Sequence, residues 1–326
     1  MKTNGWRMVL FIWVLAGCAR PEYRTMEGNI YGTYYRVRYQ AAVDLSGEVL
    51  KQIEQVNASL SMFDTASVVS GLNRGTTDRV DSLFVKMFRT AFLVHQATNG
   101  AFDITVAPLV NAWGFGYKQR MLPSESQVDS LLSFVGLEKM RLEGERLIRP
   151  EGMEIDASSI AKGLGVDLAA ECLEQNDVEN YLVDIGGEVR VKGRNPRGTA
   201  WRVGIDSPVE HPEEGRQVRV VVSLTAGSLA TSGNYRNFYL HEGKKYGHTI
   251  DPRSGYPVQQ ELLSATVYAQ SCMLADAYAT AFMVLGLEKS RAIAEGTPDL
   301  EVCFIYDEKG EERIWMTDKF RTFVCE

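Results

Sequence analysis

The stretch "YLVDIGGEVRVKG", residues 181–193, decides the fold class of this 326-residue chain. It consists of two strand-like runs on either side of Gly186-Gly187, and paired glycines within a strand mark a bulge or a close backbone approach. Two further strand-like stretches follow, "WRVGIDSP" (201–208) and "RQVRVVVSL" (216–224). Because strands and helices do not alternate strictly, the pattern favours an α+β fold of mainly antiparallel sheet with packed helices over a doubly wound sheet.

Helices are predicted on both sides of this strand region. Apolar residues at helical spacing predict helices over residues 45–63, 81–97, 155–176 and 273–296. Ser124, after Pro123, is predicted to cap another helix. Residues 29–40 are predicted to be a strand, and residues 300–317 a closing hairpin. No linker of Pro, Gly and Ser divides the chain, so we expect a single functional unit.

Composition narrows the class of protein. Apolar residues make up 45% of the chain and charged residues 24%, which is typical of a packed core rather than of disorder. The formal net charge is −7, and no basic stripe interrupts it. A nucleic-acid partner is therefore not expected.

The first eighteen residues, "MKTNGWRMVLFIWVLAGC", are typical of a targeting segment. A positive start precedes an apolar run over residues 8–16, which is too short to span a bilayer. The run ends in a segment that resembles a bacterial lipobox, so we expect residues 1–17 to be a signal peptide and Cys18 to be lipidated. The body, residues 18–326, would then be tethered to a membrane. A plain secretory signal and a chance apolar start are the alternatives.

Cysteines and histidines form no metal motif that spacing alone identifies. No disulfide is predicted among the remaining cysteines, which are Cys172, Cys272, Cys303 and Cys325. His248 lies in "KKYGHTIDPRSGYP" (244–257), and composition alone favours a histidine in a turn. The other histidines have no functional setting and are expected to be surface or core residues: His95, His211 and His241.

The stretch "CMLADAYATAFMVLG" (272–286) places Asp276 and Thr280 one helical turn apart on one face. A carboxylate and a hydroxyl are hard oxygen ligands that suit Mg²⁺, and the alanines around them permit close approach. We expect Asp276 to project from a packed helix toward the protein surface. The alternative is a cap or a satisfied polar pair within the core, which the spacing by itself favours.

The stretch "EIDASSIAKGLGVD" (154–167) places Asp156 just before a helix that contains Gly163 and Gly165. Glycine inside a helix costs about 1 kcal/mol relative to alanine, so these two indicate close approach of a ligand or of another backbone. A helix N-terminus also favours phosphate. Tight helix packing remains an equal alternative. A further stretch, "GAFDITVAPLVNAWGFG" (100–116), is predicted to be a structured loop.

These stretches, in this order, resemble the ApbE family, the FAD:protein FMN transferases. The resemblance covers nearly all of the body and also includes "SGLNR", "TSGNYRNFY" and "YGHTIDPRSGYP". It implies an ApbE-like (T-fold-like) architecture. It also implies binding of FAD and Mg²⁺, transfer of FMN to a Thr or Ser hydroxyl of a target protein, and release of AMP.

The resemblance further implies a partner and a location. The acceptor would be a subunit of a membrane redox complex with a Ser/Thr-Gly-Ala-Thr-like motif. The protein would lie in the cell envelope, anchored by lipid and facing the periplasm, on the inner-membrane face. Two alternatives remain, an FAD pyrophosphatase that forms FMN and AMP, and an FAD-binding lipoprotein without turnover.

Site residues are carried over by position from the family pattern. Asp276 and Thr280 would hold Mg²⁺ together with Ser159, through its backbone carbonyl or its hydroxyl. His248 would be the catalytic base. Arg236 and Arg253 flank it and are further candidates for phosphate contact. The residues that would contact FAD, besides His248, are Tyr31, Ser61, Met62, Phe63, Ala101, Phe102, Asp103, Asp156, Lys162, Thr249 and Ile250.

Overall fold

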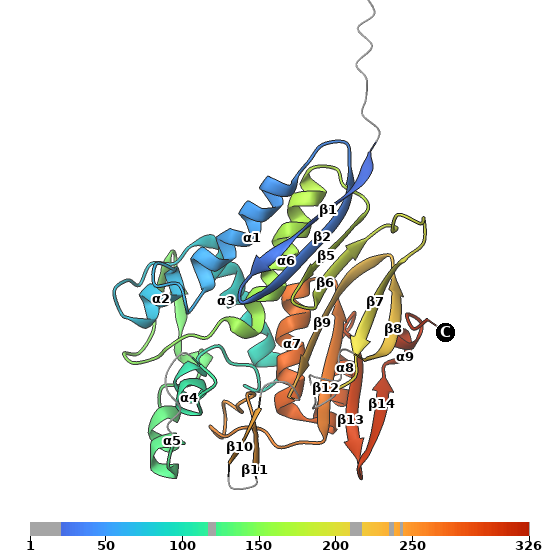
Figure 1. The fold of residues 1–326 in the computed structure, drawn as a ribbon. Coiled ribbons are helices and arrows are strands. Elements are labelled where there is room, and N and C mark those ends of the chain that lie inside the picture. The colour runs from blue at the N-terminus through green and yellow to red at the C-terminus, as the bar shows by residue number, and fades with distance from the viewer. Residues whose placement is uncertain (1–20, 117–121, 209–216, 235–237, 242–243, 326) are drawn as a thin grey trace, which may run out of the picture.

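A computed structural model describes residues 21–116, 122–208, 217–234, 238–241 and 244–325. The predicted signal peptide and Cys18 lie outside these residues. The centre of the fold is an eight-stranded sheet in which every neighbouring pair is antiparallel, in the order β1-β2-β5-β6-β9-β12-β13-β14 (Figure 1). The predicted α+β class is therefore confirmed. Its strands are β1 (Glu22–Ile30), β2 (Thr33–Ala41), β5 (Tyr181–Ile185), β6 (Glu188–Lys192), β9 (Ala226–Gly233), β12 (Leu262–Ala269), β13 (Glu301–Glu308) and β14 (Glu311–Met316).

Helices cover one face of this sheet. The predicted helices form as α1 (Ser46–Leu60), α3 (Ser82–Ala97), α5 (Glu125–Leu132), α6 (Ser158–Gln175), α7 (Cys272–Leu285) and α8 (Leu287–Gly296). Figure 1 shows α6 and α7 next to the sheet and α1 and α3 outside them. Buried side chains of β2 and β5 pack against α1 and α6, while those of β12 and β13 pack in one cluster with α3 and α7. The shorter helices are α2 (Val68–Asn73), η1 (Leu137–Lys139), α4 (Ala107–Ala112) and α9 (Asp318–Arg321).

The opposite face of the sheet is covered only in part. Strands β7 (Trp201–Asp206) and β8 (Val218–Leu224) form a separate ribbon that packs with α9 against β6, β9, β12 and β13. Over β2 the same face presents the exposed side chains of Arg36 and Arg38. Two small hairpins complete the described fold: β3 (Arg141–Glu143) with β4 (Arg146–Ile148), and β10 (Phe238–His241) with β11 (Lys244–Gly247).

Two turns differ from the prediction. Residues 29–40 are not one strand, because Tyr31 and Gly32, with φ of 52° and 74°, turn the chain between β1 and β2. Alternating aromatic residues conceal this turn in the sequence. Gly186 and Gly187, with φ of 64° and 104°, form the turn between β5 and β6 rather than a bulge. Gly186 also allows close approach, since a Cβ there would lie 2.7 Å from Cγ2 of Thr33.

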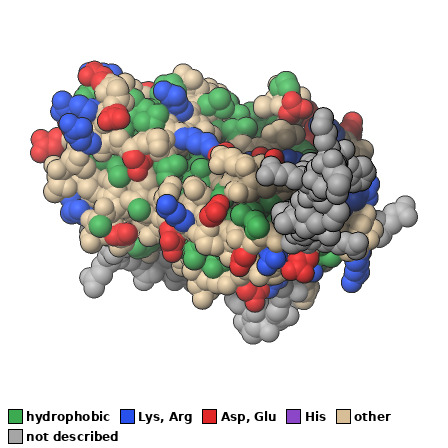
Figure 2. Space-filling view, turned by 90° about the horizontal axis from the view of Figure 1, so that it is seen from above, with side chains coloured by type: hydrophobic (Ala, Val, Ile, Leu, Met, Phe, Trp, Pro, Cys, Tyr) green, Lys and Arg blue, Asp and Glu red, His purple; other side chains and the backbone are tan. Residues whose placement is uncertain are grey.

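Other features agree with the sequence. Ser124 caps α5 in a capping box, and the closing hairpin forms from β13 and β14. Residues 100–116 are ordered, but they include helix α4. The four cysteines of the described chain are free, and within the described residues no helix is long and apolar enough to cross a membrane. On the face of the molecule seen in Figure 2, acidic and basic side chains are interspersed over the described residues, without a continuous basic stripe.

Candidate functional site

A cavity of about 420 Å³ lies where α6 and α7 meet the end of β9. It brings together thirteen of the fifteen residues predicted to bind FAD or metal or to act in catalysis. They come from five separate parts of the chain, so the fold itself assembles this set. The thirteen are Met62, Phe63, Ala101, Phe102, Asp103, Asp156, Ser159, Lys162, His248, Thr249, Ile250, Asp276 and Thr280.

The remaining two, Tyr31 and Ser61, line an adjoining cavity of about 540 Å³. The Tyr31 hydroxyl donates a hydrogen bond to the carbonyl of Ile53. The Ser61 hydroxyl accepts one from the amide of Phe63 at 3.1 Å. Met62 and Phe63 line both cavities, and the Phe63 side chain is 73% exposed. Phe63 is thus an exposed aromatic ring between two hollows, free to stack on a planar ligand.

Asp276 is buried, and the expectation that it faces the surface is wrong. Its exposed fraction is 3%, and its Oδ2 accepts a hydrogen bond from the amide of Gly163 at 3.0 Å. A Cβ on Gly163 would lie 2.5 Å from the carbonyl oxygen of Cys272, so glycine is required where α6 crosses α7. The helix glycine therefore serves close backbone packing. Burial raises the pKa of Asp276, and the nearby Lys162 ammonium opposes that rise.

Lys162 of α6, which is half-buried, forms an ion pair with the buried Glu188, the first residue of β6. One carboxylate oxygen of Glu188, Oε2, has no hydrogen-bond partner in the described structure. Burial raises the pKa of Glu188 to about 7, against the lowering effect of Lys162. Burial alone would lower the pKa of Lys162, but Glu188 and Asp276 outweigh it and keep the ammonium charged. The cavity thus has a permanent positive charge in its wall, which suits a phosphate ligand.

Oxygen donors converge on the same cavity from two helices. Thr280 lies one turn beyond Asp276 on α7, and its hydroxyl is 3.3 Å from that of Ser232 on β9. Ser159 lies in the first turn of α6. A carboxylate, a hydroxyl and the oxygens of a serine form a hard-oxygen donor set, which fits Mg²⁺ and leaves room for phosphate and water. The residues present therefore fit the predicted metal.

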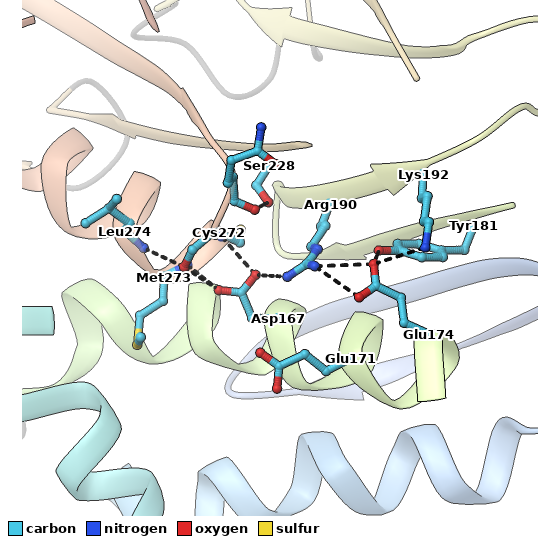
Figure 3. Close-up of polar contacts among 12 residues, drawn as sticks. Asp167, Glu171, Glu174, Tyr181, Arg190, Lys192, Ser228, Cys272, Met273 and Leu274 are labelled. Carbon is cyan, nitrogen blue, oxygen red and sulfur yellow. Dashed lines mark hydrogen bonds and ion pairs between the residues drawn. The ribbon is translucent and has the colours of Figure 1, made fainter. Parts of the chain in front are cut away.

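A second buried network sets the position of α7 relative to α6 (Figure 3). Oδ1 of Asp167, on α6, accepts hydrogen bonds from the Cys272 amide at 2.9 Å and from Arg190 at 2.8 Å. Oδ2 accepts from the Met273 amide at 2.9 Å and the Ser271 hydroxyl at 2.7 Å. Asp167 thus caps the N-terminus of α7 from another helix, in addition to the N-cap residue Ser271. This cap fixes the register of Asp276 and Thr280 against Ser159.

The segment that carries His248 follows β11 and is held at several points. The Thr249 hydroxyl donates to Oδ1 of Asn234 at 2.5 Å, and the Val258 amide donates to the Thr249 carbonyl at 2.9 Å. The indole of Trp113, just after α4, donates to the carbonyl of Gly255 at 2.8 Å. These contacts hold the backbone around the histidine beside the cavity, and the aromatic neighbours of its ring include Phe115.

His95 has a structural setting that the sequence did not predict. Its Nδ1 lies 2.9 Å from the carbonyl of Phe102 and 3.4 Å from Oδ2 of Asp103, and its Nε2 lies 3.5 Å from Glu138. The three side chains are close enough to share a metal ion. The Asp103 carboxylate, however, already accepts hydrogen bonds from the amides of Thr105 and Leu137, so His95 serves to support residues 101–103.

Four residues named in the sequence analysis remain, and the structure describes two of them, Arg253 and His241. Arg253 forms a two-bond pair with Asp251, at 2.8 Å for each bond, and lines a hollow with His95 rather than the cavity. His211 and Arg236 lie outside the described residues, and His241 is the last residue of β10.

Ten of the described residues that line the cavity, and Glu188 beside it, were not among the predicted site residues. Thr231, Ser232 and Gly233 end β9 and line the cavity, and Glu188 pairs with Lys162. A signal was present for the first three, because "TSG" ends a run of small residues in a strand. For Glu188 the signal was a lone acidic residue directly after the Gly186–Gly187 turn.

The fold and the cavity define an α+β protein with an oxygen-rich pocket, lined by three aspartates and one lysine, that is suited to a metal and a phosphorylated ligand. The family model described as "ApbE family" matches residues 31–304. The chain belongs to the ApbE family.

Similar proteins cover almost the whole chain. The FAD:protein FMN transferase of Vibrio cholerae is 35% identical over 95% of this chain and 96% of its own length. That of Haemophilus influenzae is 36% identical over 86% of each. Among solved structures, the flavin transferase ApbE from Vibrio cholerae has a TM-score of 0.84 and 32% identity, covering 93% of this chain and 99% of that one. The flavinyl transferase ApbE of Pseudomonas stutzeri, in its apo form, has a TM-score of 0.82 and 30% identity over 93% and 97% of the two chains.

Proposed function

We propose that this chain is a Mg²⁺-dependent flavin transferase. It would move FMN from FAD to the hydroxyl of a Thr or Ser in an acceptor protein and release AMP. The observation that carries the proposal is the convergence of His248 with the oxygen donors Asp276 and Thr280 on one cavity, in a chain whose relatives are named for this activity.

The reaction is a transfer at phosphorus. The acceptor hydroxyl oxygen attacks the phosphorus on the flavin side of FAD, a new O–P bond forms, and the bond from that phosphorus to the bridging oxygen breaks. AMP leaves with the bridging oxygen. His248 accepts the hydroxyl proton, because a neutral imidazole is a base near neutral pH. When bound, Mg²⁺ neutralises charge on the two phosphates.

The other residues bind and orient the substrate. The Lys162 ammonium faces the phosphates, and Asp276, Thr280 and Ser159 hold the metal. Asp156, buried at the start of α6, accepts a hydrogen bond from the Ser158 amide at 2.8 Å and so shapes the turn that the phosphates approach. Phe63 stacks on the flavin ring between the two cavities, and the pocket wall is completed by Met62 and residues 101–103 on one side and by Thr249 and Ile250 on the other.

The protein is further proposed to be a lipoprotein of the cell envelope, anchored through Cys18 after removal of residues 1–17 and facing the periplasm. Its acceptor would be a subunit of a membrane redox complex. Labelling with radioactive palmitate tests the anchor, and Cys18→Ser should abolish incorporation. Unchanged labelling of that variant would contradict it.

The activity is tested by incubating the protein with FAD, Mg²⁺ and the flavin-carrying subunit of such a complex. Mass spectrometry should find one FMN added to the subunit and AMP in solution. Free FMN and AMP without an adduct would instead indicate an FAD pyrophosphatase. His248→Ala should lower the transfer rate by about 10²–10⁴-fold while FAD still binds, as measured by quenching of flavin fluorescence. Normal transfer by that variant would place the base elsewhere.

A further inference from the structure

A groove of about 980 Å³ lies on the sheet face opposite α6 and α7. One wall is the uncovered face of β2 and β5, where Arg36, Arg38 and Leu182 alternate with residues buried against the helices. The other wall is β7, every residue of which lines the groove. Figure 1 shows the β7–β8 ribbon standing beside this part of the sheet.

The groove is positively charged on an acidic protein. Four arginines and two aspartates line it, which gives a net charge of +2 where the whole chain carries −7. Arg36 pairs with exposed Glu27 at 3.2 Å. No carboxylate of the described chain lies within ion-pair distance of the other three, and all three side chains are exposed: Arg38, Arg197 and Arg202. Unpaired guanidinium groups in a concave surface attract an anionic partner.

The groove also has a free strand edge. Strand β7 pairs with β8 on one side, and no strand of the described chain pairs with its other edge. An unpaired edge presents backbone N–H and C=O groups, which an extended peptide can satisfy by adding a strand. The partner that fits this groove is therefore an extended chain rather than a helix.

One end of the groove meets the flavin cavity. Thr231 on β9 lines both hollows, and the Gly186–Gly187 turn lines the groove. Val189 pairs with Leu229 across β6 and β9, which places that turn and Thr231 at the same end of the sheet. A chain lying along β7 would reach the cavity at this end.

We propose that this groove binds an extended acidic segment of the acceptor protein, which pairs with the edge of β7 and passes its Thr or Ser hydroxyl over Thr231 toward His248. The proposal rests on the flavin transferase function. It assigns recognition of the protein substrate to a surface distinct from the one that binds FAD.

The test uses two fluorescently labelled 14-residue peptides that contain Ser-Gly-Ala-Thr, one with four flanking Glu residues and one with Gln in their place. Fluorescence anisotropy measures binding to the wild type and to Arg38→Glu/Arg202→Glu. The charge-matched control is Lys51→Glu/Arg89→Glu, since Lys51 on α1 and Arg89 on α3 are exposed on the helical side. Mass spectrometry of the same peptides with FAD and Mg²⁺ measures transfer.

The wild type and the control should bind the Glu peptide at least about tenfold more tightly than the Gln peptide, with a strong salt dependence, and the groove variant should lose this preference. In the groove variant KM for the peptide should rise by a similar factor while the dissociation constant for FAD stays unchanged. Equal binding of both peptides by the wild type, or an unchanged preference in the groove variant, overturns the proposal.

Two further outcomes separate this proposal from others. If the Glu peptide binds in an arginine-dependent way but no FMN is transferred to it, the result would support the groove as a docking surface and count against the transferase function. A dimer of the wild type that the groove substitutions dissociate, measured by analytical ultracentrifugation, would overturn the proposal in favour of a second copy of this chain.

Discussion

Helices α6 and α7 and strand β6 meet at two buried charge clusters that differ in one respect. Around Asp167, both carboxylate oxygens accept two hydrogen bonds each, from the α7 backbone, Ser271 and Arg190. Around Lys162, Oε2 of Glu188 has no partner, and Asp276 faces a cavity. Buried polar groups are normally satisfied, so an unsatisfied one needs an explanation.

We infer from this difference that the cluster around Asp167 stabilises the fold, whereas the cluster around Lys162 is available for chemistry. Burial alone would lower the pKa of Arg190, but Tyr181 and Asp167 raise it above its ordinary value. In the second cluster burial raises the pKa of both Glu188 and Asp276, which indicates that the charged carboxylates lack full compensation. Ionisable groups with a shifted pKa beside a cavity are typical of functional sites.

The largest expected effect comes from the second cluster. Asp276→Ala should reduce Mg²⁺-dependent flavin transfer by about 10³-fold, because a carboxylate ligand is lost at the reacting phosphates. Release of AMP measures the rate. Because Asp276 is buried, the variant should also lose about 1–2 kcal/mol of unfolding free energy as the Gly163 amide loses its acceptor. Asp276→Asn, which keeps the acceptor oxygen, should retain that stability but not the rate. Full activity of either variant would contradict the metal assignment.

The next effect belongs to the first cluster and should appear in stability. Asp167→Asn replaces an oxygen that accepts hydrogen bonds with a donor and leaves Arg190 without part of its counter-charge. The unfolding free energy should fall by about 3 kcal/mol, as measured by urea denaturation. The folded fraction of this variant should transfer flavin at a rate within about tenfold of the wild-type rate. A collapse of the rate with unchanged stability would break the distinction between the two clusters.

A smaller effect concerns pH. The pKa of Glu188 in the folded protein is about 7, above its ordinary value of 4.5. The folded state therefore binds a proton that the unfolded state has released, and this contribution to stability is lost as pH rises from about 5 to 7. Glu188→Gln should reduce the change in unfolding free energy between pH 5 and pH 7 by about 2 kcal/mol, as measured by urea denaturation at both pH values. Exposed Glu151→Gln is the control and should leave the slope unchanged. An unaltered slope in Glu188→Gln would show that another group titrates.

The smallest effect is expected at Ser232. Its hydroxyl contacts that of Thr280 at 3.3 Å, so Ser232→Ala should raise the Mg²⁺ concentration for half-maximal transfer by about threefold. Ser228→Ala removes a hydroxyl from the same strand that bonds Gln270 at 3.2 Å, away from the cavity. It should leave the Mg²⁺ requirement unchanged. If both variants raise the Mg²⁺ concentration for half-maximal transfer equally, the effect comes from a change in strand β9 rather than from loss of the Ser232 hydroxyl.

Local patterns predicted most of the fold. Helical spacing gave α1, α3, α6 and α7, and consecutive strands gave the antiparallel sheet. The turn at Tyr31 was hidden because a non-glycine residue adopts positive φ there. Helix α4 was hidden because it has only six residues, too few for a period to appear.

The site was predictable where its residues are close in sequence. Asp276 and Thr280 are one turn apart, and the motif around His248 came from the family resemblance. The burial of Asp276 was not predictable, since α7 is apolar on nearly every side and offers no polar face from which to judge exposure. Nor were the Lys162–Glu188 pair and the Asp167 cap, because both depend on how separate elements cross.

The cap on α7 has a consequence for biosynthesis. The bonds from Asp167 to the amides of Cys272 and Met273 join residues 105 and 106 positions apart. A nascent chain that ends between β6 and α7 therefore contains Asp167 and Arg190, both destined for the interior, but no helix end to supply the amides that Asp167 accepts from.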